Sequence, residues 1–412
     1  MAGLLLILGT FSAAATETGG TCCQDIERRI DDLSAATASG RQVSLEVSGK
    51  LQRSVLYWSD QQESNAYVVD PTSGGSFFTF SGDAEVDSKW GAGFLLEIEV
   101  PVNPSDELSQ TVASFTPAPA VGAAHFYIAH EDVGTLGLGK QTEAHDHITE
   151  SDLSATDDFA SPSVADWNGG FLLRRRGGGR LPIDGATWSL FGADGIGDGE
   201  EANIIRFDTP EERTLQGSLS WGMGGVSAVA LRYEETSADF KVMGGAAFAY
   251  YAEDSRSPCR DIDELAQCAT VAGSISIKHL PSGLSATAAA GFIAINPSSA
   301  AGDDHWFYAK LARAWSLTKL GATTTYSEYF YGTRSLEADL DTLGPTGAGI
   351  IGLRAETSVF GAGVMQTLDG MDIDFYLSLR RYEIEASTSG PMPQSLPLQP
   401  FSAILAGSRI TF

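Results

Sequence analysis

Residues 43–57 read VSLEVSGKLQRSVLY, and apolar and polar side chains alternate along this stretch. Because successive side chains of a strand point to opposite faces, a period of two predicts a β-strand with one apolar and one polar face. Only Arg53 interrupts the apolar face. The other residues on that face are Val43, Leu45, Val47, Gly49, Leu51, Val55 and Tyr57.

The same alternation recurs to the last residue of the chain. Several of the strands it predicts exceed the five or six residues usual in soluble sheets and approach the length that a tilted strand needs to cross a bilayer. We therefore expect about sixteen strands. The further candidates are residues 78–86, 90–100, 124–128, 136–138, 187–191, 203–209, 215–221, 227–234, 240–251, 271–279, 284–292, 306–315, 322–330, 351–366, 373–382 and 401–412.

These apolar faces need an apolar environment. Lipid provides one, and a closed cylinder leaves no unpaired backbone edge in hydrocarbon. We therefore predict an all-β chain in which residues 41–412 form a transmembrane antiparallel β-barrel of about 16 strands. Short turns such as residues 279–283 alternate with long polar connections, as in outer-membrane barrels. Arg53 is then expected at a subunit contact or near the membrane boundary, and a large soluble β-domain is the alternative.

The charge balance excludes one class of partner. The 412 residues include 26 Lys and Arg against 53 Asp and Glu, which gives a formal net charge of −27. Nucleic-acid binding requires a basic face that neutralises phosphates, so we expect no nucleic-acid partner. With only 4 cysteines, the chain is not a disulfide scaffold either.

The N-terminus has the features of an exported protein. An apolar run at residues 4–11 precedes small residues, so we expect residues 1–15 to be a secretory signal peptide. No Lys or Arg occurs before Arg28, which leaves two interpretations: a truncated signal peptide or an ordinary buried helix. Ile26, Ile30 and Leu33 then have helical spacing, and residues 16–40 are predicted to be a short periplasmic helical segment.

The cysteines fall into two pairs. Cys22 and Cys23 lie before the helical segment, and the sequence leaves open whether they are modified, cross-linked or free. Cys259 and Cys268 flank an acidic loop, and in an oxidising compartment they are expected to form a local disulfide.

The longest stretch without alternation, about residues 142–180, is predicted to fold into the barrel as a constriction loop. Its carboxylates would then face basic residues of the wall and set a transverse field that selects small polar solutes. A solvated surface loop is the alternative, and each wall arginine could instead pair with a neighbouring carboxylate such as Asp208 or Glu234. The predicted loop residues are Glu143, Asp146, Glu150, Asp152, Asp157 and Asp158, and the predicted wall residues are Lys50, Arg206, Arg232, Arg354, Arg380 and Arg409.

No residue pattern indicates catalysis. His145 and His147 lack a clustered third ligand, and the remaining histidines are scattered, so we expect no metal site. The sequence has no nucleophile elbow, no HExxH and no phosphate-binding glycine loop. We expect neither a cofactor nor an enzymatic activity.

The chain resembles the alphaproteobacterial outer-membrane porins. The motifs that carry the resemblance are residues 43–49, 63–70, 90–94, 138–141, 150–154, 205–210 and 409–412. The resemblance implies a homotrimer of sixteen-stranded barrels in the outer membrane of a Gram-negative bacterium. It also implies an inward-folded loop after the fifth strand, passive diffusion of small hydrophilic solutes, and a terminal Phe412 that is read by the barrel-assembly machinery. The triple arginine at residues 174–176 departs from the family pattern.

We therefore predict a general diffusion porin embedded in outer-membrane lipid, with a cation preference from its acidic excess. One rival is a solute-specific channel for sugars or anions. Another is a non-conducting adhesion barrel, which would require bulky apolar residues at pore-facing positions.

Overall fold

The structure, a computed structural model, describes residues 43–177, 186–192, 197–211, 214–222, 225–252, 267–296, 304–339, 350–388 and 394–412. The predicted signal peptide, the predicted helical segment, Cys22, Cys23 and Cys259 lie outside these residues. No helix among the described residues combines the length and the hydropathy needed to cross a bilayer.

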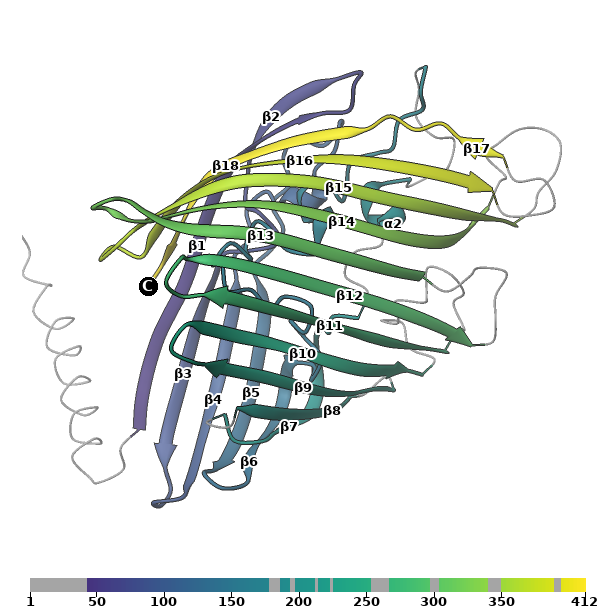
Figure 1. The fold of residues 1–412 in the computed structure, drawn as a ribbon. Coiled ribbons are helices and arrows are strands. Elements are labelled where there is room, and N and C mark those ends of the chain that lie inside the picture. The colour runs from purple at the N-terminus through teal and green to yellow at the C-terminus, as the bar shows by residue number, and fades with distance from the viewer. Residues whose placement is uncertain are drawn as a thin grey trace, which may run out of the picture. The chain divides into compact units, whose positions relative to one another are not determined.

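The described residues form one antiparallel sheet of 18 strand segments (Figure 1). The segments are β1 (Val43–Ser59), β2 (Ser64–Val69), β3 (Phe77–Glu85), β4 (Trp90–Glu99), β5 (Ala120–His130), β6 (Gly134–Thr142), β7 (Glu201–Asp208), β8 (Leu215–Gly222), β9 (Val226–Thr236), β10 (Phe240–Tyr251), β11 (Gln267–His279), β12 (Leu284–Asn296), β13 (Asp304–Thr318), β14 (Gly321–Asp339), β15 (Ile350–Leu368), β16 (Ile373–Thr388), β17 (Ser395–Leu396) and β18 (Phe401–Thr411).

The sheet closes on itself. Consecutive wall strands pair with each other, and β1 also pairs with β18 from Lys50–Thr411 to Ser59–Ser402. β2 and β3 both pair with β1, and β17 and β18 both pair with β16, so each of these two pairs forms one interrupted strand of the wall. The barrel therefore has 16 antiparallel wall strands, which confirms the predicted fold class.

The outer face of the wall is apolar. On β1, Leu45 and Val55 are 69% and 47% exposed, whereas the inward-facing Gln52 and Leu56 are fully buried. Soluble proteins usually bury apolar side chains, whereas around this barrel apolar side chains lie on the outside. Examples on successive strands are Val229, Phe248, Val271, Phe292, Phe307, Phe360, Leu377 and Ile404.

The two ends of the barrel differ. The turns at one end, such as residues 131–133, 237–239 and 319–320, are short, whereas connections at the other end include residues 143–200 between β6 and β7. We call these the turn end and the loop end. Gly321 shows why the turns need glycine: its φ is +142°, and a β-carbon there would lie 2.4 Å from the carbonyl oxygen of Thr367.

Among the described residues, three short helices lie outside the sheet: η1 (Ser105–Glu107), η2 (Val164–Trp167) and α2 (Trp188–Phe191). The prediction of a strand at residues 187–191 is wrong. Thr187 caps α2, because its side chain accepts a hydrogen bond from the backbone N–H of Leu190. The buried residues there have helical spacing, because Trp188 and Phe191 are three positions apart and lie on one side of this single helical turn.

A charge on the outer face should destabilise the barrel according to its depth. Val271 lies outward on β11, opposite Phe248 on β10 and Phe292 on β12. We expect Val271→Arg to cost about 2–4 kcal/mol of unfolding free energy in lipid vesicles. His279→Arg, at the turn end of the same strand, should cost at most about 1 kcal/mol. Equal losses in urea titrations of the two variants would argue against a lipid-facing wall.

Candidate functional site

The connection between β6 and β7 lies against the inside of the wall; we call residues 143–177, 186–192 and 197–200 of it the inner loop. Its backbone bonds to small inward-facing serines. The N–H groups of Ala144, Ser151 and Leu153 donate to the hydroxyls of Ser220, Ser274 and Ser276 at 2.9, 3.0 and 3.1 Å. Small polar side chains on β8 and β11 thus let the loop backbone approach the sheet and satisfy its donors.

A buried ion pair fastens the middle of the inner loop. The ammonium of Lys310 on β13 lies 3.1 Å from Asp152, and the two side chains are 2% and 4% exposed. The same ammonium donates to the carbonyl of Ala160 at 2.6 Å and to the hydroxyl of Thr156 at 3.1 Å. Each ammonium proton therefore has an acceptor in the loop, which offsets the cost of burying the charge.

Asp158 is held by two wall cations. Lys50 lies 2.9 Å from its carboxylate, and Arg409 forms a second ion pair with it. Arg409 also contacts Asp374 on β16 at 2.8 Å. Asp157, next in the loop, is exposed. Lys50 and Arg409 thus lie inside the barrel, but their charges are directed at a loop carboxylate.

Arg380 is more deeply buried. Its guanidinium pairs with Glu328 at 2.7 Å, with side-chain exposures of 1% and 2%, and donates to the carbonyl of Ser161 at 3.1 Å. It also stacks over the ring of Trp167 at 4.5 Å. Arg380 therefore positions the loop and does not face an aqueous opening.

Arg206 and Arg232 lie where the inner loop begins. Arg206 pairs with Asp208 at 2.9 Å, which is the neighbouring-carboxylate alternative considered above, and it also donates to the carbonyl of Thr142 at 3.1 Å. Arg232 donates to the carbonyl of Asp146 at 2.6 Å. Glu143 is buried and accepts from the backbone N–H of Glu200 at 3.4 Å.

The prediction that Arg354 lines the pore is wrong. Its neighbours Leu353 and Ala355 are buried inside, whereas Arg354 shares the outward side of β15 with exposed Phe360 and lies 3.9 Å from Glu356. Near the loop end of β15 the inner face is apolar and the outer face is polar. A prediction from residue polarity therefore assigns the two faces of this part of the strand the wrong way round.

Arg53 also lies on the outer face. Its guanidinium contacts Asp70 at 2.9 Å and the hydroxyl of Ser76 at 2.9 Å, at the interruption between β2 and β3. The charge thus compensates a break in the wall. The expectation of a subunit contact or membrane boundary at Arg53 stays a prediction.

The apolar inner face belongs to an aromatic core inside the barrel. Phe171 of the inner loop packs against Trp58 and Phe401, each at a ring-centroid distance of 5.0 Å, and Trp188 packs against Tyr382 at 5.6 Å. These side chains are at most 3% exposed. Bulky apolar residues at pore-facing positions, the feature expected of a plugged barrel, therefore occur beside β1, β16 and β18.

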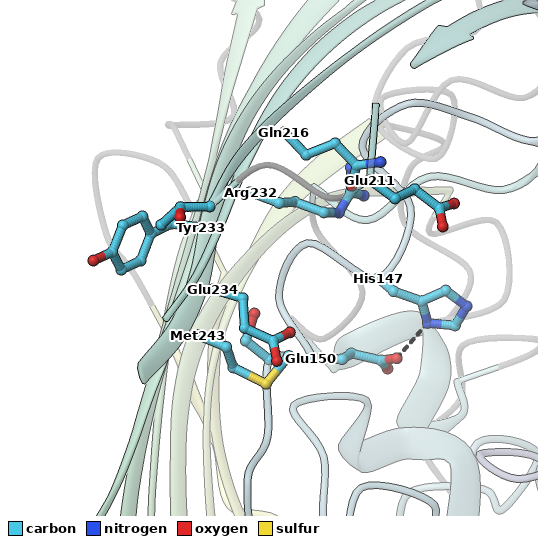
Figure 2. A pocket seen from close by; sticks show the side chains of 11 residues that line it. His147, Glu150, Glu211, Gln216, Arg232, Tyr233, Glu234 and Met243 are labelled. Atoms are coloured by element: carbon cyan, nitrogen blue, oxygen red, sulfur yellow. Dashed lines mark hydrogen bonds and ion pairs between the residues drawn. The ribbon is translucent and has the colours of Figure 1, made fainter. Parts of the chain in front are cut away.

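Two cavities lined by described residues lie beside other strands. The turn-side cavity, about 320 Å³, lies against β8 to β10 and is lined by Gln216, Arg232 and Met243 (Figure 2). The loop-side cavity, about 400 Å³, is lined by residues 70–77 and by Glu97, Glu99 and Glu201. The described inner loop thus fills one side of the barrel with side chains and leaves space along β3, β4 and β7 to β10.

The two histidines of the inner loop have opposite environments. His145 is fully buried against Tyr251, whose hydroxyl lies 2.8 Å from its Nε2, and burial lowers the pKa of His145 to about 4. His147 is exposed, and its hydrogen bond to Glu150 raises its pKa to about 9. The two rings thus contact different side chains, Tyr251 and Glu150.

Three carboxylates form a cluster that the sequence prediction missed. Oxygens of Glu97, Glu99 and Glu201 lie within 4.8 Å of one another, beside Gly122, which leaves room for them. The alternation on β4 already placed Glu97 and Glu99 on its polar face. Glu201 lies on β7, which pairs with β6, and the spacing of residues in the sequence could not predict that Glu201 joins the other two.

The other predicted residues lie away from the cavities. Phe412 exchanges backbone hydrogen bonds with Gly49 at 2.9 and 3.1 Å, and its ring lies 5.9 Å from that of Phe78. Cys268 is disulfide-bonded. Since Cys259 lies outside the described residues, the predicted pairing stays a prediction.

Comparisons with known proteins agree with this geometry. The family model for Gram-negative porins matches residues 12–387. Similar solved structures include the anion-selective porin from Comamonas acidovorans (10% identity, 90% of this chain and 100% of that chain, TM-score 0.55) and the trimer form of the outer membrane protein OmpT of Vibrio cholerae (10%, 90% and 99%, 0.53). A third is OmpF of Salmonella typhi in complex with daunomycin (10%, 89% and 97%, 0.52). No curated protein matches the chain.

A closed barrel with an apolar outer face is the architecture of outer-membrane barrel proteins, to which the porins belong. The chain belongs to the Gram-negative porin family. It is a porin of the outer membrane and forms a channel there.

Removing one partner of the Lys310–Asp152 pair should release the inner loop. Lys310→Met leaves Asp152 buried without its charge partner, which should cost about 3–5 kcal/mol of loop docking. We expect a larger and noisier single-channel conductance in planar bilayers. Lys89→Met, which breaks exposed pairs with Glu131 and Asp132, should leave the conductance unchanged. Native conductance in Lys310→Met would mean that the pair does not hold the loop.

Proposed function

We propose that this porin passes small hydrophilic solutes by passive diffusion, prefers cations, and catalyses no reaction. The opening runs beside β3, β4 and β7 to β10. One observation carries the proposal: the inward-facing wall cations are engaged by carboxylates of the loop or wall, except Arg232, which donates to a loop carbonyl, whereas other carboxylates face the two cavities.

The charges support the sign of this preference. Lys50, Lys310 and Arg380 pair with Asp158, Asp152 and Glu328. In the loop-side cavity, Glu201 pairs with Lys140 at 3.3 Å, but no basic side chain in the described part of the chain forms an ion pair with Glu97 or Glu99. Low-dielectric walls around such carboxylates concentrate cations and repel anions.

Of the predicted loop carboxylates, Asp152 is not suited to a charge-reversal test of selectivity, whereas Glu150 is. Charge reversal at Asp152 would break a buried ion pair, so its effect on reversal potential would include loop release. Glu150 lines the turn-side cavity and pairs with the exposed His147, so charge reversal there changes the field without breaking a buried ion pair. A solute-specific channel would differ by showing saturable current that its solute blocks.

The remaining inferences concern assembly. From its motifs we assign the chain to the alphaproteobacterial porins, and we infer a homotrimer in outer-membrane lipid whose Phe412 is read by the barrel-assembly machinery. The similarity to a trimeric barrel supports the assembly. Light scattering of the detergent-solubilised protein should give three chains per particle, and a monomer across the concentration range that folds and conducts would contradict the trimer.

Neutralising the carboxylate cluster should weaken the cation preference. In a potassium chloride gradient, we expect Glu97→Gln combined with Glu99→Gln to shift the reversal potential toward the anion value, because two charges leave the loop-side cavity.

Glu356→Gln on the outer face is the matched control and should leave the potential unchanged. A native protein without any cation preference would contradict the proposal, as would an unshifted potential in the double variant.

A further inference from the structure

His147 is the residue at which the two cavities meet. Among the described lining residues, it alone is shared by both. The turn-side cavity is lined by Glu211 and Thr214 of the connection between β7 and β8, whereas the loop-side cavity is lined by Glu99 and Glu201 at the opposite strand ends. A solute that moves from one cavity to the other therefore passes the imidazole of His147.

The backbone around His147 is fixed while its side chain is exposed. His147 has a left-handed φ of +54°, and its carbonyl accepts from the N–H of Glu150 at 3.2 Å. The next residue, Ile148, is 1% exposed and packs against Ala230, Ala247 and Ala272 of the wall. The imidazole itself is 73% exposed. The loop thus presents one titratable ring into the opening from a rigid support.

Two carboxylates face this ring. Nδ1 of His147 lies 2.6 Å from Glu150, and Nε2 lies 3.3 Å from Asp146 (Figure 2 shows the contact with Glu150). A protonated imidazole neutralises part of the charge that these carboxylates direct at the opening, whereas a neutral imidazole leaves it unscreened.

We propose that His147 determines the ion selectivity of this porin through its protonation state. The protonated imidazole reduces the cation preference, and the neutral imidazole restores it. This inference rests on the proposed cation-selective function and names the residue that regulates it.

The other charged groups near His147 determine where the effect is measurable. Burial raises the pKa of Asp146 to about 6 and that of Asp198 to about 7, so both are ionised well above pH 7. The hydrogen bond to Glu150 raises the pKa of His147 to about 9, so its charge is lost above that pH. The other charged groups that line the two cavities are Arg232, Glu211, Glu234, Asp70, Glu97, Glu99 and Glu201.

The sign follows from this order. Between pH 8 and pH 10, His147 loses its positive charge while the carboxylates stay ionised, so the opening becomes more negative. We expect the cation-to-anion permeability ratio of the native channel to rise by up to about 25-fold. One unit charge about 4 Å from the ion path in water changes the energies of the cation and of the anion in opposite directions, which changes the permeability of each by about a factor of five.

The test is the reversal potential of purified native and variant channels in a potassium chloride gradient at pH 8 and pH 10. The variant His147→Asn should give the high cation-to-anion permeability ratio already at pH 8 and show no change between pH 8 and pH 10. Asparagine is chosen because it tolerates a left-handed backbone conformation. His147→Lys should keep the low ratio at both values. His130→Asn, at the turn end of β5, is the matched control and should behave as the native protein.

A pH step that persists in His147→Asn, or a native ratio that is flat across this range, would overturn the role of His147. If the native channel still prefers cations, neither of these two results would contradict the proposed cation-selective function. A native channel that favours anions at every pH would instead contradict the proposed function itself. A fold check by circular dichroism of each variant separates these outcomes from misassembly.

Discussion

Backbone hydrogen bonding in hydrocarbon is the constraint on which the rest of this structure depends. A strand edge exposed to lipid leaves N–H and C=O groups unpaired at a cost of several kcal/mol each, so the sheet must close, as it does through β1 and β18. Closure also fixes the two faces of every strand. Once lipid covers one face, the other encloses an interior that polar groups, a loop or water must fill. The break between β2 and β3 shows the constraint locally, because Arg53 supplies donors where the ladder is interrupted.

The interior is divided between two kinds of contact. On one side, the inner loop and the wall share a dry aromatic core, and buried pairs such as Lys310–Asp152 and Arg380–Glu328 fix its position. On the other side, the loop meets small residues, Ser274 and Ala272 among them, and space remains. The wall cations that a simple pore would present to solutes are thus used to hold the loop, and the carboxylates around the remaining space determine the field there.

The sequence could predict what depends on period and polarity. Alternation identified the closed barrel and the outward face of β16, where Phe375, Leu377 and Leu379 are half exposed. The prediction from alternation was wrong where apolar residues face the interior and polar residues face outward. Leu353 and Ala355 face inward because the aromatic core lies there, which places Arg354 outside. Spacing also could not foresee which cations the loop would bury, because the contact between Arg380 and Ser161 joins residues far apart in the chain. The roles of His147 and Glu201 likewise required the paired strands.

The asymmetric interior can be tested by thiol accessibility during current recording. Gln216 lines the turn-side cavity, whereas Ser378 is 1% exposed beneath the inner loop, and both lie on strands of the same wall. With a cysteine at position 216, a positively charged thiol reagent should reduce the single-channel current within the recording, and with a cysteine at position 378 it should have no effect beyond that on the native channel. Block at position 378 with none at position 216 would place the water path on the opposite side of the barrel and contradict this account.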